Sequence, residues 1–163
     1  MAKTKIEFEQ FADAAGGEHR GFVSALHQFM LDNDCRYEIK EAKAGYVLSY
    51  IFEPANRTVL NYVFRKKGPM IRIYGDNAAF YMQRFAGWPA EMKASVQKTR
   101  DCRRMLDPNA CLSTCMMGFT FMLDGAEMKK CRNNCFMFYL SEDNNFFLRE
   151  MVEQEMKYRQ LKN

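Results

Sequence analysis

Two long runs of strand-forming residues, joined by a short Pro/Asn loop, constrain the fold of this chain more than any other feature. The runs are GYVLSYIFE (45–53) and TVLNYVFRKKG (58–68), and the loop is PANR (54–57). Val, Tyr and Phe favour extended backbone, whereas Pro and Asn favour turns. The segment therefore predicts an antiparallel hairpin, and its apolar residues require helices packed on at least one sheet face.

Shorter segments predict further strands on both sides of this hairpin. They are CRYEIKEA (35–42), MIRIYG (70–75), GFTFMLDG (118–125) and CFMFYL (135–140). Ile71 and Ile73 face the same side of their segment, as alternation along a strand requires. Asp124 and Gly125 predict a turn after GFTFML. Together these segments predict an antiparallel sheet of about five or six strands.

Helical periodicity occupies the beginning, the middle and the end of the chain. The segments are 5–34, interrupted at Gly16-Gly17, then 77–105, interrupted at GWPAE (87–91), and 141–163. Ser141 is a good N-cap for the last helix. The apolar stripe of that helix is formed by Phe147, Leu148, Met151, Val152 and Met156. The sequence thus predicts one α+β domain over residues 1–163, with N-terminal, middle and C-terminal helices on one side of the sheet.

Charge and hydropathy exclude some partners. The net charge of the 163-residue chain is +4, whereas nucleic-acid-binding domains usually carry a dense basic stripe, so nucleic acid is not an expected partner. The N-terminal MAKTKIEFEQFADAAGG lacks the apolar h-region of a signal peptide. No apolar run approaches the ~18–20 residues of a membrane span. We therefore expect a cytoplasmic protein with no membrane partner, whose thiols stay reduced.

Five of the six cysteines fall in one cysteine-rich segment, residues 102–135, with the spacing C-x8-C-x3-C-x15-C-x3-C. A structural zinc site needs four thiolate or imidazole ligands in a tetrahedron. Cys111 and Cys115 form a close pair after a predicted Asp-Pro-Asn turn. Cys102 is expected at the end of the middle helix, and Cys131 at the start of a late strand. We predict that these four cysteines bind Zn²⁺, and that the whole segment is a metal-binding segment.

Other uses of the cysteines stay open. Cys135 is the reserve ligand, because residues four apart in a strand lie about 13 Å apart, unless the strand begins after Cys135. Cys35 lies far away in sequence and is expected to be an ordinary thiol. The same ligands would suit iron or an iron–sulfur cluster. The basic side chains beside the cysteines would also suit a redox or nucleophilic thiolate. They are Arg100, Arg103, Arg104, Lys129, Lys130 and Arg132.

The element order resembles the YdhG-like family (DUF1801-like), small bacterial α+β domains of unknown function. The stretches that carry the resemblance are GYVLSYIFE, TVLNYVF, MIRIYG and KKCRNNCFMFYLSEDNNFFLREMVEQEM. The cysteine-rich segment is instead similar to that of uncharacterised Firmicutes proteins with the pattern C…LDP..C...C..G(Y/F).F...G....KC....F.F. The residues that match this pattern are Cys102, Leu106-Asp107-Pro108, Cys111, Cys115, Gly118-Phe119, Phe121, Gly125, Lys130-Cys131, Phe136 and Phe138. The resemblance implies the α+β fold and no catalytic motif.

Relatives of this fold have been likened to frataxin, which implies iron binding on an acidic helix face. The first helix offers Glu7, Glu9, Asp13 and Glu18, followed by Arg20. A solvated surface is the simpler interpretation of these charges.

Residues 46–52 are apolar on both faces of their strand, so one face can line a ligand cavity. We expect Tyr46, Tyr50, Asn61 and Arg72 in that cavity. The sequence thus predicts a non-enzymatic, zinc-containing domain that binds a small ligand or a protein partner. The alternative is a thiol-redox or iron-handling protein that uses its cysteines directly.

Overall fold

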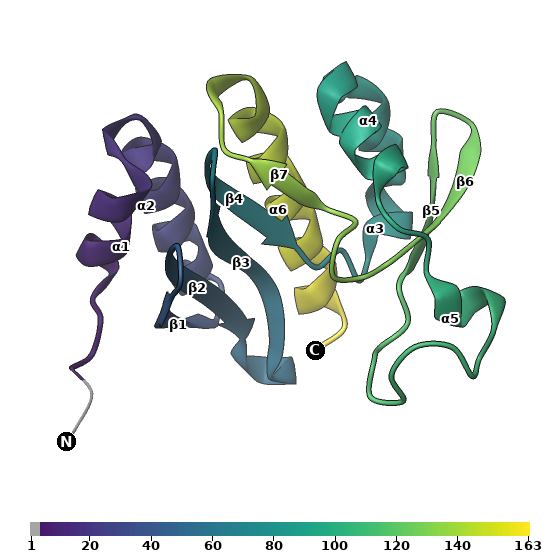
Figure 1. Ribbon diagram of the computed structural model, residues 1–163, viewed down its shortest axis with the longest axis horizontal. Helices are drawn as coiled ribbons and strands as arrows, with labels where there is room; N and C mark the ends of the chain where they lie inside the picture. Colours follow the sequence, from purple (N-terminus) through teal and green to yellow (C-terminus); the bar gives the residue numbers. More distant parts are fainter. Residues whose placement is uncertain (1–3) are drawn as a thin grey trace.

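The computed structural model describes residues 4–163 as an α+β structure built on a five-stranded antiparallel sheet (Figure 1). Residues 1–3 of the predicted domain lie outside the described residues. The strand order is β1-β2-β3-β4-β7. The strands are β1 (Cys35–Ala42), β2 (Gly45–Phe52), β3 (Arg57–Arg65), β4 (Gly68–Ile73) and β7 (Met137–Tyr139). The predicted antiparallel sheet is therefore confirmed.

The central hairpin of the sheet, β2 and β3, forms where the sequence predicts it. A 3₁₀ turn, η1 (Glu53–Ala55), joins the strands and ends at Asn56 in the left-handed conformation. Tyr50 and Tyr62 point toward the helices, where both side chains are fully buried. The centre of the Tyr62 ring lies 5.2 Å from the centre of the Phe11 ring. The Tyr50 hydroxyl lies 2.7 Å from Nδ1 of a helical histidine, His27. The apolar face of the hairpin therefore forms the centre of the core.

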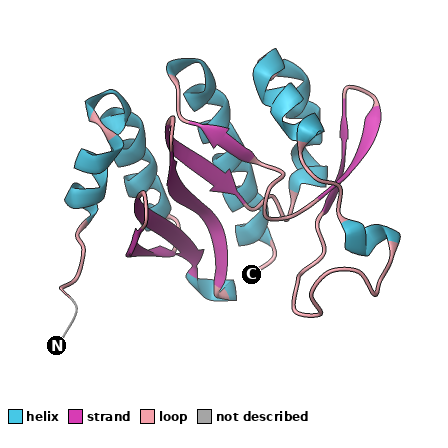
Figure 2. Cartoon of the chain, in the orientation of Figure 1, coloured by secondary structure: helices cyan, strands magenta, loops and turns pink. Residues whose placement is uncertain are grey.

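Two N-terminal helices and the C-terminal helix cover this face of the sheet (Figure 2). They are α1 (Phe8–Ala15), α2 (Gly17–Asp32) and α6 (Glu142–Leu161). Gly16 separates α1 from α2 at a φ of 100°, which favours glycine because it has no Cβ. Ser141 caps α6 as predicted, since its hydroxyl accepts a hydrogen bond from Asn144 N. In the described part of the chain no helix, α6 included, is long and apolar enough to cross a membrane.

The middle of the chain contains several short helices and an extended stretch. They are α3 (Ala78–Tyr81), η2 (Met82–Gly87), α4 (Ala90–Lys98) and α5 (Arg103–Leu106). The expectation that Cys102 ends the middle helix is wrong. The helix α4 stops at Thr99, whose hydroxyl bonds to Val96 O at 2.7 Å, and residues 99–102 are extended. Cys102 is instead the N-cap residue of α5.

A second, two-stranded sheet lies beside the main one, so the late strands do not all join a single sheet (Figure 1). It pairs β5 (Phe119–Leu123) with β6 (Ala126–Lys130). Asp124 and Gly125 form the predicted turn, and both have positive φ, as tight hairpin turns require. The strand β6 was not predicted, because AEMKK contains no β-branched or aromatic residue.

Candidate metal centre and adjoining pocket

The four cysteines predicted to bind zinc line one small cavity. Cys102, Cys111, Cys115 and Cys131 all contribute to a cavity of about 20 Å³, which has room for a single water molecule or metal ion. The arginines that share the lining are Arg100, Arg103, Arg104 and Arg132. The chain thus brings together thiols from three segments and surrounds them with positive charge.

Strand-like pairing fixes Cys102 and Cys131 relative to each other. Cys102 N donates to Lys129 O at 2.8 Å, and Cys131 N donates to Arg100 O at 2.9 Å. Between these bonds, Asp101 forms an antiparallel bridge with the residue opposite. Because side chains alternate along a strand, the two cysteines lie on the same face as diagonal neighbours. Diagonal neighbours have Cα atoms about 7–8 Å apart, which is close enough for both thiols to bind one metal ion.

Lys130 lies between Lys129 and Cys131 and points to the opposite face. Its ammonium is buried and bonds to Gln97 O at 3.0 Å, Thr99 O at 2.9 Å and Asp101 Oδ1 at 2.9 Å. These carbonyls belong to the C-terminal end of α4, where a cation is favourable. Lys130 therefore anchors β6 to α4 and does not line the thiol cavity.

Tight turns bring Cys111 and Cys115 to the cavity. Asp107 Oδ1 accepts a hydrogen bond from Asn109 N at 3.0 Å, which confirms the predicted Asp-Pro-Asn turn. Cys111 has a φ of 65°, in the left-handed region that few residues other than glycine adopt. The Arg104 guanidinium donates to the backbone carbonyl of Cys115. Backbone strain of this kind often accompanies a functional role.

Gly118 supports the cavity from its other side. Its backbone N–H donates to the Cys102 sulfur, with 3.3 Å between nitrogen and sulfur. A Cβ at this position would lie 1.9 Å from Lys130 O, so only glycine permits this close approach.

The thiols are gathered at the cavity but are not arranged as a tetrahedron. Among residues 4–163, no three His, Cys, Asp or Glu side chains are close enough together to hold a metal ion as they stand. The Cys115 thiol, for example, lies 3.2 Å from Met116 O and donates to it. Zinc binding therefore requires side-chain rotation around the cavity, and it stays a prediction.

The two remaining cysteines lie in the apolar core. Burial raises the pKa of Cys35 to about 12 and raises that of Cys135 well above its ordinary value. Residues 131–135 form a turn in which Cys135 N bonds to Cys131 O at 3.0 Å, and β7 begins only after it. Strand spacing therefore does not separate Cys131 from Cys135. The fully buried Cys135 side chain is instead held away from the cavity by its packing.

The predicted ligand cavity on the sheet requires correction. Tyr46 and Tyr50 lie on the face that the N-terminal helices cover, and the Tyr50 hydroxyl bonds within the core. Asn61 pairs with Ser49 across the sheet, and Arg72 pairs with Asn61, so both lie on the opposite face. The four residues therefore do not share one cavity, because adjacent positions along a strand alternate between faces.

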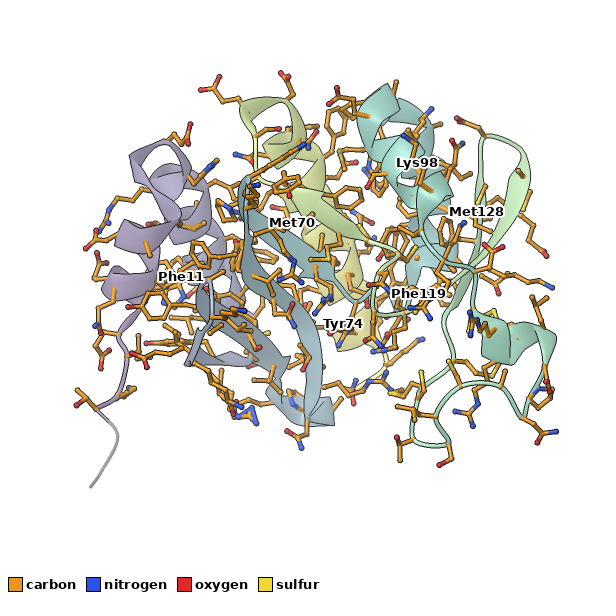
Figure 3. All side chains as sticks on the ribbon, viewed as in Figure 1. Phe11, Met70, Tyr74, Lys98, Phe119 and Met128 are labelled. Atoms are coloured by element: carbon orange, nitrogen blue, oxygen red, sulfur yellow. The ribbon has the colours of Figure 1, made fainter. Side chains whose placement is uncertain are left out.

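A larger pocket, which the sequence did not reveal, adjoins the cysteine cavity. Its volume is about 350 Å³, and its lining includes Arg57, Asp76, Arg159 and, shared with the cysteine cavity, Arg132. The Arg132 guanidinium lies 5.2 Å from the ring centre of Tyr74 and 5.4 Å from that of Phe119. Figure 3 labels both aromatic residues, where the main sheet meets the cysteine-rich segment.

One sequence signal points to this pocket. Glu155 and Arg159 lie on the buried side of α6, which otherwise presents apolar side chains to the core. Charged residues are rarely buried unless they are paired. A charged i,i+4 pair on an apolar helix face therefore indicates an internal ion pair, although its partners elsewhere in the chain cannot be read from spacing.

The acidic surface of α1 is partly neutralised within the chain. The Arg20 guanidinium binds the carboxylates of Glu9 and Asp13, and Glu7 forms a capping box with Gln10. These contacts leave few free carboxylates for iron on this helix.

Comparison with known proteins finds no match, whether to a family model, to a curated protein or to a solved structure. The resemblance to the YdhG-like family therefore stays a prediction that rests on the sequence alone.

Proposed function

We propose that this protein is a non-enzymatic domain that contains one structural zinc ion and binds a small ligand or a protein partner. One observation carries the proposal: four cysteines from three separate segments line a single cavity of about 20 Å³. Cysteines with a purely packing role would be expected within the hydrophobic core cluster, where Cys35 and Cys135 are found.

The donor set and its surroundings suit zinc. Four thiolates around Zn²⁺ leave about two net negative charges, which the four lining arginines would offset. Metal binding itself requires the thiolate form of the ligands. In this proposal zinc links residues 103–118, which contain only the short helix α5, to the end of β6 and to the extended residues 99–102. A metal of this kind contributes directly to folding free energy.

The ligand or partner site lies beside the metal in this proposal. The cysteine-rich segment exposes several large apolar side chains, and exposed apolar groups of this kind often mark a contact surface. They are Leu106, Leu112, Met116 and Met117. The pocket of about 350 Å³ next to this segment is large enough for a small molecule.

Direct use of the thiols is the second candidate function. Cys111 is exposed, and cationic arginines surround the cavity, which are the conditions for a reactive thiolate. Iron or an iron–sulfur cluster would use the same four sulfurs. Either alternative would replace zinc as the reason for gathering these residues.

Metal content and a series of Cys→Ser variants test the proposal. Protein purified under reducing conditions should contain about one zinc per chain. Cys102→Ser, Cys111→Ser, Cys115→Ser and Cys131→Ser should each lose most of this zinc and lower the melting temperature. Cys35→Ser and Cys135→Ser are the matched controls, and they should keep full zinc content even where they destabilise the core.

Thiol labelling separates the two candidate functions. Zinc-loaded protein should react slowly with an alkylating reagent at Cys111 until a chelator removes the metal, after which Cys111 should react fastest. Rapid labelling of the untreated protein, or bound iron in place of zinc, would support direct use of the thiols. Zinc loss in Cys135→Ser, with retention in Cys131→Ser or Cys102→Ser, would contradict the proposed ligand set.

A further inference from the structure

The pocket beside the cysteine cavity is built around a single carboxylate held by three arginines. Arg57 Nη2 lies 2.8 Å from Asp76 Oδ2, and Arg159 Nη2 lies 3.4 Å from the same oxygen. Arg132 Nη1 binds the other oxygen, Oδ1. Lys162 also lines the pocket and contacts Asn77 Oδ1 at 2.5 Å. The arginines come from β3, from the turn after β6 and from α6.

Further hydrogen bonds hold the Arg159 side chain in place at this pocket. Its Nε donates to Glu155 Oε2 at 2.8 Å, and its Nη2 donates to Tyr74 O at 2.9 Å. The Glu155 carboxylate is fully buried and also accepts hydrogen bonds from Asn77 and from the Tyr81 hydroxyl at 2.7 Å. Burial beside this carboxylate raises the pKa of Tyr81, so its hydroxyl stays protonated and keeps donating.

The charges at the pocket do not balance. Three arginines and Lys162 face one lining carboxylate, Asp76, and one buried carboxylate beneath it, Glu155, so two positive charges are left uncompensated. The donors also outnumber the acceptors. Among residues 4–163, Arg132 donates hydrogen bonds only through Nη1 to Asp76, and Arg57 only through Nη2. Most guanidinium N–H groups of these two residues are therefore free to bind another acceptor.

We propose that this pocket binds the oxyanion, carboxylate or phosphate, of a small molecule. Arginine forks match both groups in geometry, and hydrogen bonds between charged partners are the strong ones. The uncharged part of the ligand would lie against Phe52 and Phe119, which line the same pocket. This inference rests on the ligand-binding half of the proposed function and names the class of ligand.

The cysteine-rich segment forms part of this oxyanion pocket. Met117, Gly118 and Phe119 contribute one wall, and both Gly118 and Arg132 line the pocket and the cysteine cavity. The metal centre would therefore hold the wall against which the ligand rests. The proposed metal ligands are thiolates, whereas the proposed anion ligands are guanidinium groups, so the two sites can be tested separately.

Binding of inorganic phosphate and of succinate, each measured by calorimetry at low ionic strength, tests the inference. We expect saturable binding of one anion per chain. Whichever of the two anions binds more tightly identifies the oxyanion as a phosphate or a carboxylate. Arg57→Gln should weaken it at least about tenfold, since charge-assisted hydrogen bonds are lost. Asp76→Asn should tighten it severalfold, because the competing carboxylate is removed. Arg36→Gln, a comparably exposed arginine on β1 that pairs with Glu38, should leave it unchanged.

The opposite signs at Arg57 and Asp76 distinguish a binding site from a folding defect, which would weaken binding in both variants. Absence of saturable binding of either anion, or an equal loss in Arg36→Gln, would overturn the inference. Zinc content is measured on the same samples. Zinc without anion binding defeats only the oxyanion site, whereas anion binding by a zinc-free chain defeats only the metal centre.

Discussion

Arg159 Nε and Glu155 Oε2 lie 2.8 Å apart, one turn of α6 from each other, and both side chains are withdrawn from solvent. This pair joins the core to the oxyanion pocket, because the guanidinium of Arg159 also reaches Asp76. A buried carboxylate is tolerated only with such partners, since water no longer solvates it.

Arg159→Met should therefore destabilise the fold strongly. It removes the charged partner of Glu155 and leaves that carboxylate buried, which costs about 3–5 kcal/mol of unfolding free energy. Arg149→Met is the matched control, because Arg149 pairs with Glu153 at the same i,i+4 spacing and at a similar distance, 2.7 Å, on the more exposed side of α6. It should cost less than about 1 kcal/mol in urea unfolding. Equal losses in the two variants would show that the buried pair is not a special contributor.

Gly118→Ala tests the support of the cysteine cavity. The added methyl group would lie 1.9 Å from Lys130 O and 3.1 Å from Cys102 Cβ, so the backbone must shift. We expect a loss of about 1–3 kcal/mol and weaker zinc retention against a chelator. Gly21→Ala is the control, since it is exposed in α2 with no atom near the new Cβ, and should stabilise by about 0.5–1 kcal/mol. Full zinc retention by Gly118→Ala would contradict the described packing.

His27 should make stability depend on pH. Its ring stacks on Phe8 with 3.8 Å between ring centres and bonds to the Tyr50 hydroxyl, and burial there lowers the pKa of the imidazole, although Glu9 opposes this in part. The unfolded chain, with an ordinary pKa of about 6.5, then binds the proton more readily than the folded protein. Stability is therefore complete above that value and falls as the pH decreases through it.

The measurement is the unfolding free energy at about pH 7.5 and about pH 5.5, for the unaltered protein and for His27→Gln. The unaltered protein should lose more stability on acidification than the variant does. Other titrating groups are common to both proteins and cancel in the difference. The same pH dependence in both proteins would rule out His27 as its source.

The main sheet could be predicted because its strands and turns are determined by residues that are close together in the sequence. The hairpin β2–β3 carries alternating apolar residues and its own turn, and Ser141 marks the start of α6. The strand β6 could not, because its residues have little strand preference and are extended only through pairing with β5. The end of α4 at Thr99 likewise depends on a distant residue, since the Lys130 ammonium binds the last carbonyls of the helix.

The same distinction explains the sites. The spacing of the cysteines, with the turn at Asp107, favours a common site for four of them, and these four residues line one cavity, although metal binding there stays a prediction. The pocket was missed because Arg57, Arg132 and Arg159 come from separate elements, and each one alone resembles a surface charge. The error over Tyr50 and Asn61 has a simpler origin, since the register places these two on opposite faces of the sheet.

We expect Cys102, Cys111, Cys115 and Cys131 to hold one zinc ion. X-ray absorption at the zinc edge tests it most directly, on protein purified under reducing conditions and loaded with one equivalent of zinc. We expect a shell of four sulfur atoms at about 2.3 Å, reduced to three sulfurs in Cys111→Ser and unchanged in Cys135→Ser. A shell dominated by nitrogen or oxygen, or no tightly bound zinc, would contradict it.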